Sequence, residues 1–467
     1  MTVMRIPLRW VAAFIVAMTA TNAPVNAAGK RPVPSTDGAL LLGAGVDPAA
    51  QQHALARARE LLQMLIDGRY DAFLAESTEK VRGALPADKL QQVWEGTQAQ
   101  MGAFGAERDV RVQRNAGATT VVFSLCFERG DLAARFILDA EGRLAGLWFA
   151  PDTSRVTYDP PDYVDREAFR EEEVTVSAGR YPLPGTLAIP KADRPERGFC
   201  GVVLVHGSGA HDQDETVYAN KPFRDLAWGL ASRGIAVLRY EKRTHKYPGA
   251  HGNDDITLHD ETIDDAVAAA RLLRRHAAVD PGRVFVLGHS LGAVAAPFIA
   301  RDDPDLAGII LLAGCSRPLT EVIEEQVEYL VGLDGEVTAE EQQELDRTRR
   351  TLAEVRAGQL DGEPAVLPRR YLHMLKRYDP VEAARSLTLP VLIVQGGRDY
   401  QVTMKDWALW RQGLKDRANV TFRLFDKCNH LFAAGEGPSS PEEYMTAGHM
   451  AEEVITVLAG WITQGAG

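Results

Sequence analysis

The stretch Val284–Pro297, "VFVLGHSLGAVAAP", places one serine hydroxyl between two glycines. An apolar run precedes Ser290 and small residues follow it, which is typical of a buried strand that turns sharply into a helix. Side chains at Gly288 and Gly292 would collide with neighbouring backbone in such a turn. We therefore expect Ser290 to be a nucleophile at the C-terminal end of a strand, beside a helix N-terminus. The alternative is a serine that lies between two glycines by chance.

A serine hydroxyl is a weak nucleophile until a base accepts its proton. Three histidines follow Ser290 in the chain: His373, His430 and His449. His430 comes just beyond the predicted strand "VTFRLFD", at the edge where Ser290 is expected, and is the predicted base. His449 falls in a helical pattern, and His373 comes before the last strands.

Two acidic residues compete for the role of orienting His430. Asp399 follows the apolar strand "PVLIVQGG" and lies between Ser290 and His430 in the chain. This gives the chain order serine, acid, histidine. Asp426 is the rival acid, but it lies on the predicted last strand itself. We expect Asp399 to complete the catalytic triad.

Acyl transfer also needs two backbone N–H donors for the oxyanion. Leu291 supplies one at the start of the helix. The second is expected in the loop "HGSG" after the first parallel strand, from Ser208, with Gly207 as the alternative. Four polar residues of this loop could suggest a metal site: His206, His211, Asp212 and Asp214. Their spacing matches no zinc motif, so a polar loop is expected, with no metal and no cofactor.

Strands alternate with helices along residues 172–467. A hairpin, "EEVTVSAGRYPLPGTLAIP", is followed by the apolar runs "CGVVLVHG", "IAVLRYE", "VFVLGHS", "GIILLAG", "PVLIVQGG" and "VTFRLFD". Continuous apolar strands indicate a parallel sheet that is covered on both faces. The predicted fold class is therefore α/β, with a mostly parallel sheet, helices on both faces and a helical cap insertion.

Several of these segments resemble bacterial carboxylesterases of the α/β-hydrolase superfamily, close to its dienelactone-hydrolase and acyl-peptidase branches. They are "HGSG", "FRDLAWGLASRGIAVLRYEKRTHKYP", "VFVLGHSLGAVAAPFIA" and "YDPVEAARSLTLPVLIVQGGRDYQV". The resemblance covers roughly residues 172–465, implies the fold and the triad, and extends to an extra N-terminal domain. One departure is Ser208, since related esterases often have an aromatic residue or glycine there.

Residues 316–387 separate two of the predicted strands and read as helices. The resemblance implies that such an insertion is a cap over the acyl pocket. The alternative is a solvated helical bundle, since Glu321, Glu324, Glu325 and Glu328 are most simply a solvated face.

Residues 48–151 predict a separate small α+β domain. Two amphipathic helices come first, then four short alternating strands divided by the turns "NAG", "RGD" and "AEGR". The order resembles the cone-shaped folds of nuclear transport factors and ketosteroid isomerase. No catalytic motif lies in this part, so a structural or docking role is expected.

The N-terminal segment, residues 1–27, has the order of a secretory signal peptide. Arg5 and Arg9 precede an apolar core from Trp10 to Ala20, and small residues follow. The core is short for a membrane anchor, which is the alternative. We expect cleavage after about Ala27, a periplasmic or secreted protein and no stable membrane insertion.

Composition limits the partners. The chain has 467 residues, 45% of them hydrophobic, which suits two globular domains. Its net charge of −12 makes nucleic acid an unsuitable partner. The four cysteines, Cys126, Cys200, Cys315 and Cys428, are expected to be unpaired, because their positions on the predicted strands keep them apart.

The sequence thus predicts a secreted serine hydrolase that cleaves esters of small to medium acyl chains through an acyl-enzyme. The serine argues against dehalogenase and epoxide-hydrolase chemistry, which families that resemble this chain run with aspartate. The alternatives are a peptidase or acyl-aminopeptidase, a thioesterase with the same triad, or a binding protein on the same fold. The natural substrate and the oligomeric state are left open.

Overall fold

The computed structural model describes residues 41–42, 48–115, 118–152, 157–247, 256–361, 367 and 369–464. They form two compact units, which divide between residues 152 and 157. The expected signal peptide, residues 1–27, lies outside the described residues. Within the described ranges, no helix is both long enough and apolar enough to cross a membrane.

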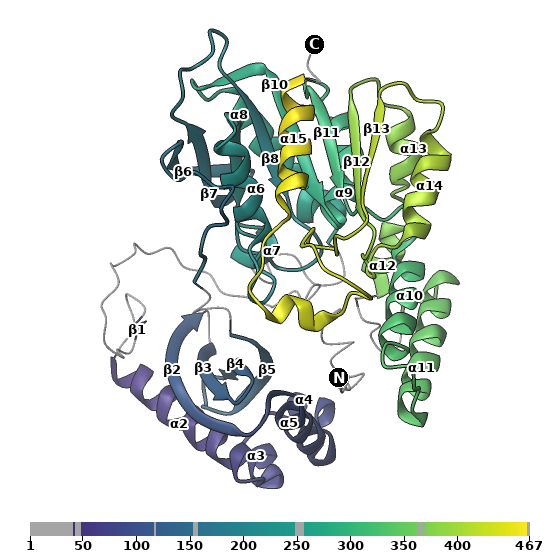
Figure 1. The fold of residues 1–467 in the computed structure, drawn as a ribbon. Helices are drawn as coiled ribbons and strands as arrows, with labels where there is room; N and C mark the ends of the chain where they lie inside the picture. Colours follow the sequence, from purple (N-terminus) through teal and green to yellow (C-terminus); the bar gives the residue numbers. More distant parts are fainter. Residues whose placement is uncertain are drawn as a thin grey trace. The chain divides into compact units, whose positions relative to one another are not determined.

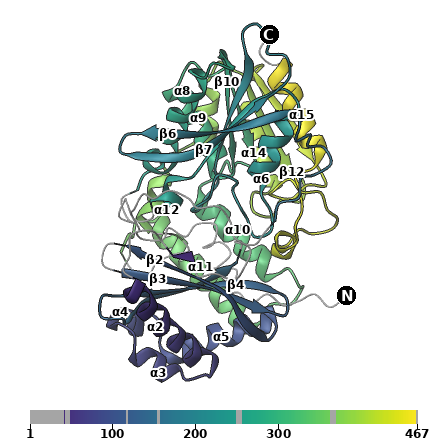
Figure 2. The ribbon, with the colours of Figure 1, turned by 90° about the vertical axis from the view of Figure 1, so that its left-hand side faces the viewer.

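The larger unit is built on one eight-stranded sheet (Figure 1). Its strands are β6 (Phe169–Ala178), β7 (Tyr181–Pro190), β8 (Phe199–Val205), β9 (Ala236–Tyr240), β10 (Val279–His289), β11 (Gly308–Leu312), β12 (Val391–Gly396) and β13 (Val420–Phe425). Their order across the sheet is β13-β12-β11-β10-β8-β9-β7-β6. The six strands from β8 to β13 run parallel to their neighbours within this set. The predicted hairpin, β6–β7, forms the antiparallel edge (Figure 2).

Helices cover both faces of this sheet. One apolar core lies between the sheet and helices α6 (Pro222–Ala231) and α15 (Glu452–Gln464). The other lies between the sheet and helices α8 (Asp264–Arg274), α9 (Leu291–Asp302) and α14 (Met404–Leu414). The strands β8 to β12 are buried along almost their whole length, which is why they read as continuous apolar runs. The predicted α/β-hydrolase fold is confirmed.

Parallel pairing brings the predicted site residues to one edge. β10 lies between β8 and β11, with Gly288 opposite Val205 and His289 opposite Leu312. The loops that follow β8, β10, β12 and β13 therefore all leave the sheet at its C-terminal edge, where ligands of open α/β sheets bind.

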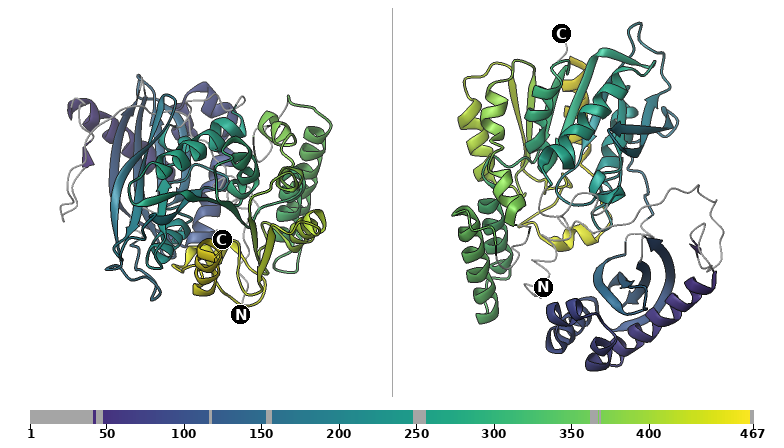
Figure 3. Two further views of the ribbon diagram at one scale, coloured as in Figure 1. Left: turned by 90° about the horizontal axis from the view of Figure 1, so that it is seen from above. Right: turned by 180° about the vertical axis from the view of Figure 1, so that it is seen from behind.

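The chain between β11 and β12 forms helices, as the sequence predicts. They are α10 (Leu319–Val331), α11 (Ala339–Arg356), α12 (Arg369–Leu375) and α13 (Pro380–Arg385). Thr338 and Glu341 close a capping box at the start of α11. Helices α10 and α11 pack side by side, as the green ribbons of Figure 3 show.

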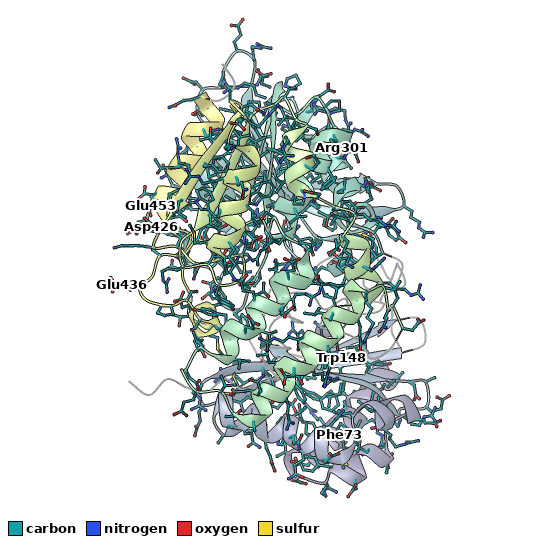
Figure 4. All side chains as sticks on the ribbon, turned by 90° about the vertical axis from the view of Figure 1, so that its right-hand side faces the viewer. Phe73, Trp148, Arg301, Asp426, Glu436 and Glu453 are labelled. Atoms are coloured by element: carbon teal, nitrogen blue, oxygen red, sulfur yellow. The ribbon has the colours of Figure 1, made fainter. Side chains whose placement is uncertain are left out.

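The smaller unit contains the four predicted antiparallel strands, β2 (Phe104–Asn115), β3 (Ala118–Phe127), β4 (Gly130–Leu138) and β5 (Leu144–Pro151). A two-residue strand, β1 (Leu41–Leu42), adds to β2 in parallel. The two predicted helices are α2 (Pro48–Ile66) and α5 (Ala87–Met101). The short helices α3 (Tyr70–Ala75) and α4 (Glu79–Ala84) between them were not predicted, because one or two turns carry too little periodicity. Phe73 of α3, which is labelled in Figure 4, packs edge-on against Phe136 of β4 inside this unit.

The four cysteines all lie in described residues, and all four are free thiols, which confirms the prediction. Cys200 and Cys428 are buried in the core below α6 and α15. Burial disfavours the thiolate and raises the pKa of Cys428 to about 11.

A buried carboxylate fastens the start of the cap insertion to helix α14. Asp406 Oδ1 accepts hydrogen bonds from the backbone N–H groups of Ser316, at 2.8 Å, and Arg317, at 3.2 Å. The Arg317 guanidinium donates to Asp406 Oδ2 at 2.6 Å and also to Glu325 of α10. Asp406 is fully buried, so these partners replace the water it has lost.

We predict that Asp406→Ala lowers the free energy of unfolding of the larger unit by about 3 kcal/mol, because it leaves buried donors without an acceptor. A urea titration followed by tryptophan fluorescence measures this loss, since Trp410 lies buried on the same helix. Glu382→Gln is the matched control. It breaks an ion pair with Arg385 in which both side chains are about half exposed or more, and its effect should stay within about 0.5 kcal/mol. Equal effects of the two substitutions would contradict the prediction.

Candidate active site

Ser290 lies in a strained turn between β10 and α9. Its φ of 53° and ψ of −114° are rare for a residue with a side chain. A Cβ on Gly288 would come within 2.1 Å of the carbonyl oxygen of Gly292, and a Cβ on Gly292 would come within 2.1 Å of the Val205 oxygen. Both positions therefore require glycine. The Ser290 N–H donates to the Leu312 carbonyl at 2.9 Å, which holds the turn against β11.

The structure brings Asp399 and His430 together. His430 Nδ1 lies 2.7 Å from Asp399 Oδ2, and both side chains are buried. The other oxygen of Asp399 accepts the N–H groups of Gln401, at 2.8 Å, and Val402, at 3.0 Å. This carboxylate therefore fixes the Nδ1–H tautomer of His430 and leaves Nε2 for a second partner.

Ser290 and His430 line the same cavity. They form no hydrogen bond with each other among the described residues. Such contacts often tighten only when substrate binds.

The rival acid does not reach His430. Asp426 follows the end of β13, is exposed and points outward in Figure 4. Among the described residues it makes no contact with the imidazole, which selects Asp399 as the partner of His430.

The expectation that His449 lies on a helix face is wrong. His449 lies in the irregular segment before α15, and its Nδ1 is 3.0 Å from Asp225 of α6. The N–H of Met450 also donates to Asp225, at 2.8 Å, so this buried carboxylate holds the segment out of the helix. His373 lies on α12 as expected, and it is not among the residues that line the cavity.

Three backbone N–H groups lie near Ser290: those of Gly207 and Ser208 in the loop after β8, and that of Leu291 at the start of α9. The Gly207 N–H donates to Glu215 Oε1 at 2.5 Å, so the alternative donor is already engaged. The N–H groups of Ser208 and Leu291 have no acceptor within the described part of the chain. A Cβ on Gly207 would lie 3.1 Å from the Ser290 Cβ, so this loop packs directly against the turn that holds Ser290.

Glu215 is a site residue that sequence reasoning missed. Its second oxygen lies 2.9 Å from His289 Nδ1, and the Nε2 of His289 lies 3.0 Å from the carbonyl oxygen of His430. One carboxylate therefore joins Gly207, in the loop after β8, to His289, the neighbour of Ser290, and through it to His430. Glu215 itself has a positive φ of 49°, a strained conformation that the surrounding contacts maintain.

Electrostatics favours an ion pair between Glu215 and His289. Burial alone would raise the pKa of Glu215, but the attraction of His289 outweighs it and lowers the pKa to about 2. Burial opposes the charged form of His289 as well, yet the nearby Glu215 carboxylate raises its pKa. Glu215 is therefore an anion at neutral pH, with the imidazole as its partner.

Lys242 is the second residue that was missed. It follows β9, is buried, and its Nζ donates to the Gly207 carbonyl at 2.7 Å and to Glu261 Oε1 at 2.6 Å. The other oxygen of Glu261 accepts the hydroxyl of Tyr371, which belongs to α12 of the cap. No pattern in a single sequence identifies such pairs, because their members lie far apart in the chain on different elements.

The four polar residues of the predicted loop stabilise its shape. His206 Nε2 contacts the Asp212 carbonyl at 3.0 Å, and His211 Nε2 contacts the Ser208 carbonyl at 2.6 Å. Burial lowers the pKa of His206 to about 3, so it is neutral. Asp214 pairs with the buried Arg239 at 2.9 Å. Among the described residues, no group of three or more His, Cys, Asp or Glu side chains is arranged to hold a metal ion.

The cap contributes part of the lining of the cavity above Ser290. Helix α10 supplies four apolar side chains to this lining, and the cap residues that line it are Leu319, Val322, Ile323, Gln326, Leu330 and Leu367. The enclosed volume of about 60 Å³ has room for roughly four to six water molecules. The expected solvated face is only partly present: Glu321 and Glu328 are exposed, whereas Glu324 pairs with Arg356 of α11 and Glu325 pairs with Arg317. The insertion therefore covers the site with an apolar face and turns acidic residues away.

Cys315 also lines this cavity, but its thiol is a poor nucleophile. Burial raises the pKa of its thiol to about 12, so it is protonated at neutral pH. Among the thiols of the chain, it is the one that lines the site.

Comparison with known proteins agrees with this geometry. Residues 202–447 match the alpha/beta hydrolase family, and residues 58–147 match a protein family of unknown function (DUF3887). Esterase EstD of Thermotoga maritima is 38% identical over 432 residues, which cover 91% of this chain and 98% of EstD. An uncharacterized peptidase, YtmA of Bacillus subtilis, is 26% identical over 40% of this chain and 60% of its own.

Among solved structures, the Pyrococcus furiosus esterase PF2001 is 16% identical with a TM-score of 0.44, covering 66% of this chain and 98% of the other. The family match spans more than half of the chain, and the match to EstD spans both proteins almost completely. The chain therefore belongs to the alpha/beta hydrolase family.

Proposed function

We propose that this carboxylesterase-type hydrolase cleaves esters of small to medium acyl chains through a covalent acyl-enzyme on Ser290. The observation that carries the proposal is the 2.7 Å contact between Asp399 and His430, at the sheet edge where Ser290 is held in a strained turn. The esterase name of the relative that matches along the whole chain supports the ester as the scissile bond.

In the acylation half-reaction, Ser290 Oγ attacks the ester carbonyl carbon while His430 Nε2 accepts its proton. Asp399 keeps the imidazole in the tautomer that can do this, since Nδ1–H points at its carboxylate. The negative charge that develops on the carbonyl oxygen is held by the Ser208 and Leu291 N–H groups. The tetrahedral intermediate then expels the alkoxide, which takes its proton from His430.

In the second half-reaction, a water molecule gives its proton to His430 and attacks the acyl carbon. Collapse of this intermediate returns the proton to Ser290 and releases the carboxylic acid. The cavity below α10 would hold the acyl chain. Its size of about 60 Å³ and its apolar wall favour short alkyl chains over long ones.

We predict that Ser290→Ala and Asp399→Asn each lower kcat on p-nitrophenyl butyrate by on the order of 10⁴ while the fold is kept. The alanine removes the atom that forms the acyl-enzyme, and the asparagine favours the wrong imidazole tautomer. Initial rates, together with fluorophosphonate labelling of Ser290 followed by mass spectrometry, measure both effects.

Asp426→Asn is the matched control for the acid. Its carboxylate is exposed, and the variant should keep nearly full activity. Retained hydrolysis by the Ser290 variant would exclude a serine mechanism, and a labelled but catalytically silent wild type would favour a binding protein.

The cap should decide the acyl preference. Each methylene buried against α10 contributes at most about 0.8 kcal/mol, or about fourfold in kcat/KM, until the cavity is full. We predict a profile over p-nitrophenyl esters that rises over short acyl chains and then falls. Ile323→Ala enlarges the cavity and should move the optimum to longer chains, whereas Val337→Ala, exposed between α10 and α11, should not. An unchanged optimum in the Ile323 variant would place the acyl chain elsewhere.

We further propose that the protein is exported, since the segment 1–27 has the order of a signal peptide. Expressed in full in a Gram-negative host, it should be found in the periplasm with its N-terminus at about Ala28. Phe14→Asp, which interrupts the apolar core, should leave uncleaved chain in the cytoplasm. A full-length chain in the soluble cytoplasmic fraction of the wild type would refute export.

A further inference from the structure

The oxyanion loop is fastened to the segment that follows β9. The backbone N–H of Lys242 donates to the His211 carbonyl at 3.1 Å, and the Thr244 hydroxyl donates to the Gly209 carbonyl at 3.4 Å. Between these contacts, the Lys242 ammonium donates to the Gly207 carbonyl at 2.7 Å. The Gly207 carbonyl belongs to the same peptide group as the Ser208 N–H.

We propose that Lys242 is a positioning residue of the oxyanion hole. Its ammonium group fixes and polarises the peptide group between Gly207 and Ser208. This inference rests on the proposed function, because an oxyanion hole matters only if acyl transfer takes place at Ser290.

Geometry supports the fixing role. The described chain contains no cis peptide bond, and a trans peptide group carries its C=O and N–H in opposite directions. A cation that holds the Gly207 oxygen therefore turns the Ser208 N–H to the opposite side of the loop. Ser208 lines the cavity with Ser290, whereas Lys242 does not line it.

Charge supports the polarising role. A positive charge on the carbonyl oxygen draws electron density from the peptide and makes its N–H a stronger donor, and this effect is larger where water is excluded. Lys242 is 2% exposed, so little water screens it. Its attraction to the peptide acts most strongly when negative charge develops on the substrate oxygen, which is the transition state rather than the ground state.

Two contacts link the Lys242 ammonium group to the cap: an ion pair with Glu261, and a hydrogen bond from Tyr371 of the cap to Glu261. Glu261 lies in a helical turn (His259–Ile263) before α8 and neutralises Lys242, with side-chain exposures of 6% and 3%. Its other oxygen accepts the hydroxyl of Tyr371 from α12. Burial raises the pKa of Tyr371 well above its usual value, so the phenol is a hydrogen-bond donor at every working pH. Tyr371 does not line the cavity, although Leu367, just before α12, does.

The test replaces the pair by neutral side chains of similar shape, Lys242→Met with Glu261→Gln, so that no buried charge is left alone. We expect kcat to fall roughly 10- to 100-fold with KM within about twofold, less than the loss of a whole oxyanion donor. The affinity of a trifluoromethyl ketone, whose hemiketal oxygen occupies the hole, should fall by the same factor. The affinity of the matching amide, a ground-state analogue, should not change.

A neighbouring buried pair gives the matched control. Arg243 donates to Asp265 of α8 at 2.6 Å, with side-chain exposures of 6% and 1%, and neither residue lines the cavity. Arg243→Met with Asp265→Asn removes the same kind of pair one residue along the chain. It should keep kcat within about twofold of the wild type.

Three results would overturn the proposal: a folded Lys242/Glu261 variant with unchanged kcat, an equal loss in the Arg243/Asp265 control, or a loss of kcat without weaker trifluoromethyl ketone binding. Should the double variant fail to fold, Tyr371→Phe decides. It removes one hydroxyl and should lower kcat several-fold with KM unchanged, and an unaltered kcat would refute the relay. Failure of the proposed function is distinct, because it is read from Ser290→Ala with Lys242 in place.

Discussion

A close approach between the backbones of β8 and α9 sets the geometry of the whole site. The first turn of α9 lies so near the end of β8 that a methyl group on Gly292 would overlap the carbonyl oxygens of Val205 and His206. This approach is possible because β8 and β10 are paired in parallel up to Gly288 and Val205. The strained Ser290 and the loop after β8 are thereby held side by side. The strain is maintained by the sheet, since a turn of this kind would relax if the flanking strands were mobile.

Near this contact, two buried ion pairs fix the position of the loop after β8, which is not part of the sheet. Glu215 pairs with His289, and Lys242 pairs with Glu261. Each pair also binds one end of Gly207: Glu215 accepts its N–H, and Lys242 donates to its carbonyl. A residue with no side chain of its own is thus fixed at both backbone groups. Buried charges that are paired and hydrogen-bonded give this rigidity without leaving an unpaired charge in the core.

The sequence predicted what depends on local pattern and chain order. The apolar strands, the glycine-flanked Ser290 and the order of Ser290, Asp399 and His430 are all readable, because parallel pairing fixes which loops share an edge. Glu215 and Lys242 were not readable, since nothing local distinguishes a buried carboxylate or ammonium from a solvated one. His449 was misplaced for a related reason: the helical pattern before α15 is broken by hydrogen bonds to Asp225, which lies on a helix in a distant part of the chain.

The cap has two separate relations to the site, and they need not act together. Helix α10 forms part of the apolar wall of the cavity, so its contacts with an acyl chain would be present in the bound substrate and in the transition state alike. Such contacts change kcat/KM and chain-length preference together. Helix α12 instead reaches the site through Tyr371, Glu261 and Lys242, none of which lines the cavity. On the proposal made above, its influence falls on the Ser208 N–H, and so on the step in which charge develops. One insertion can thus select the substrate with one helix and support the chemistry with another.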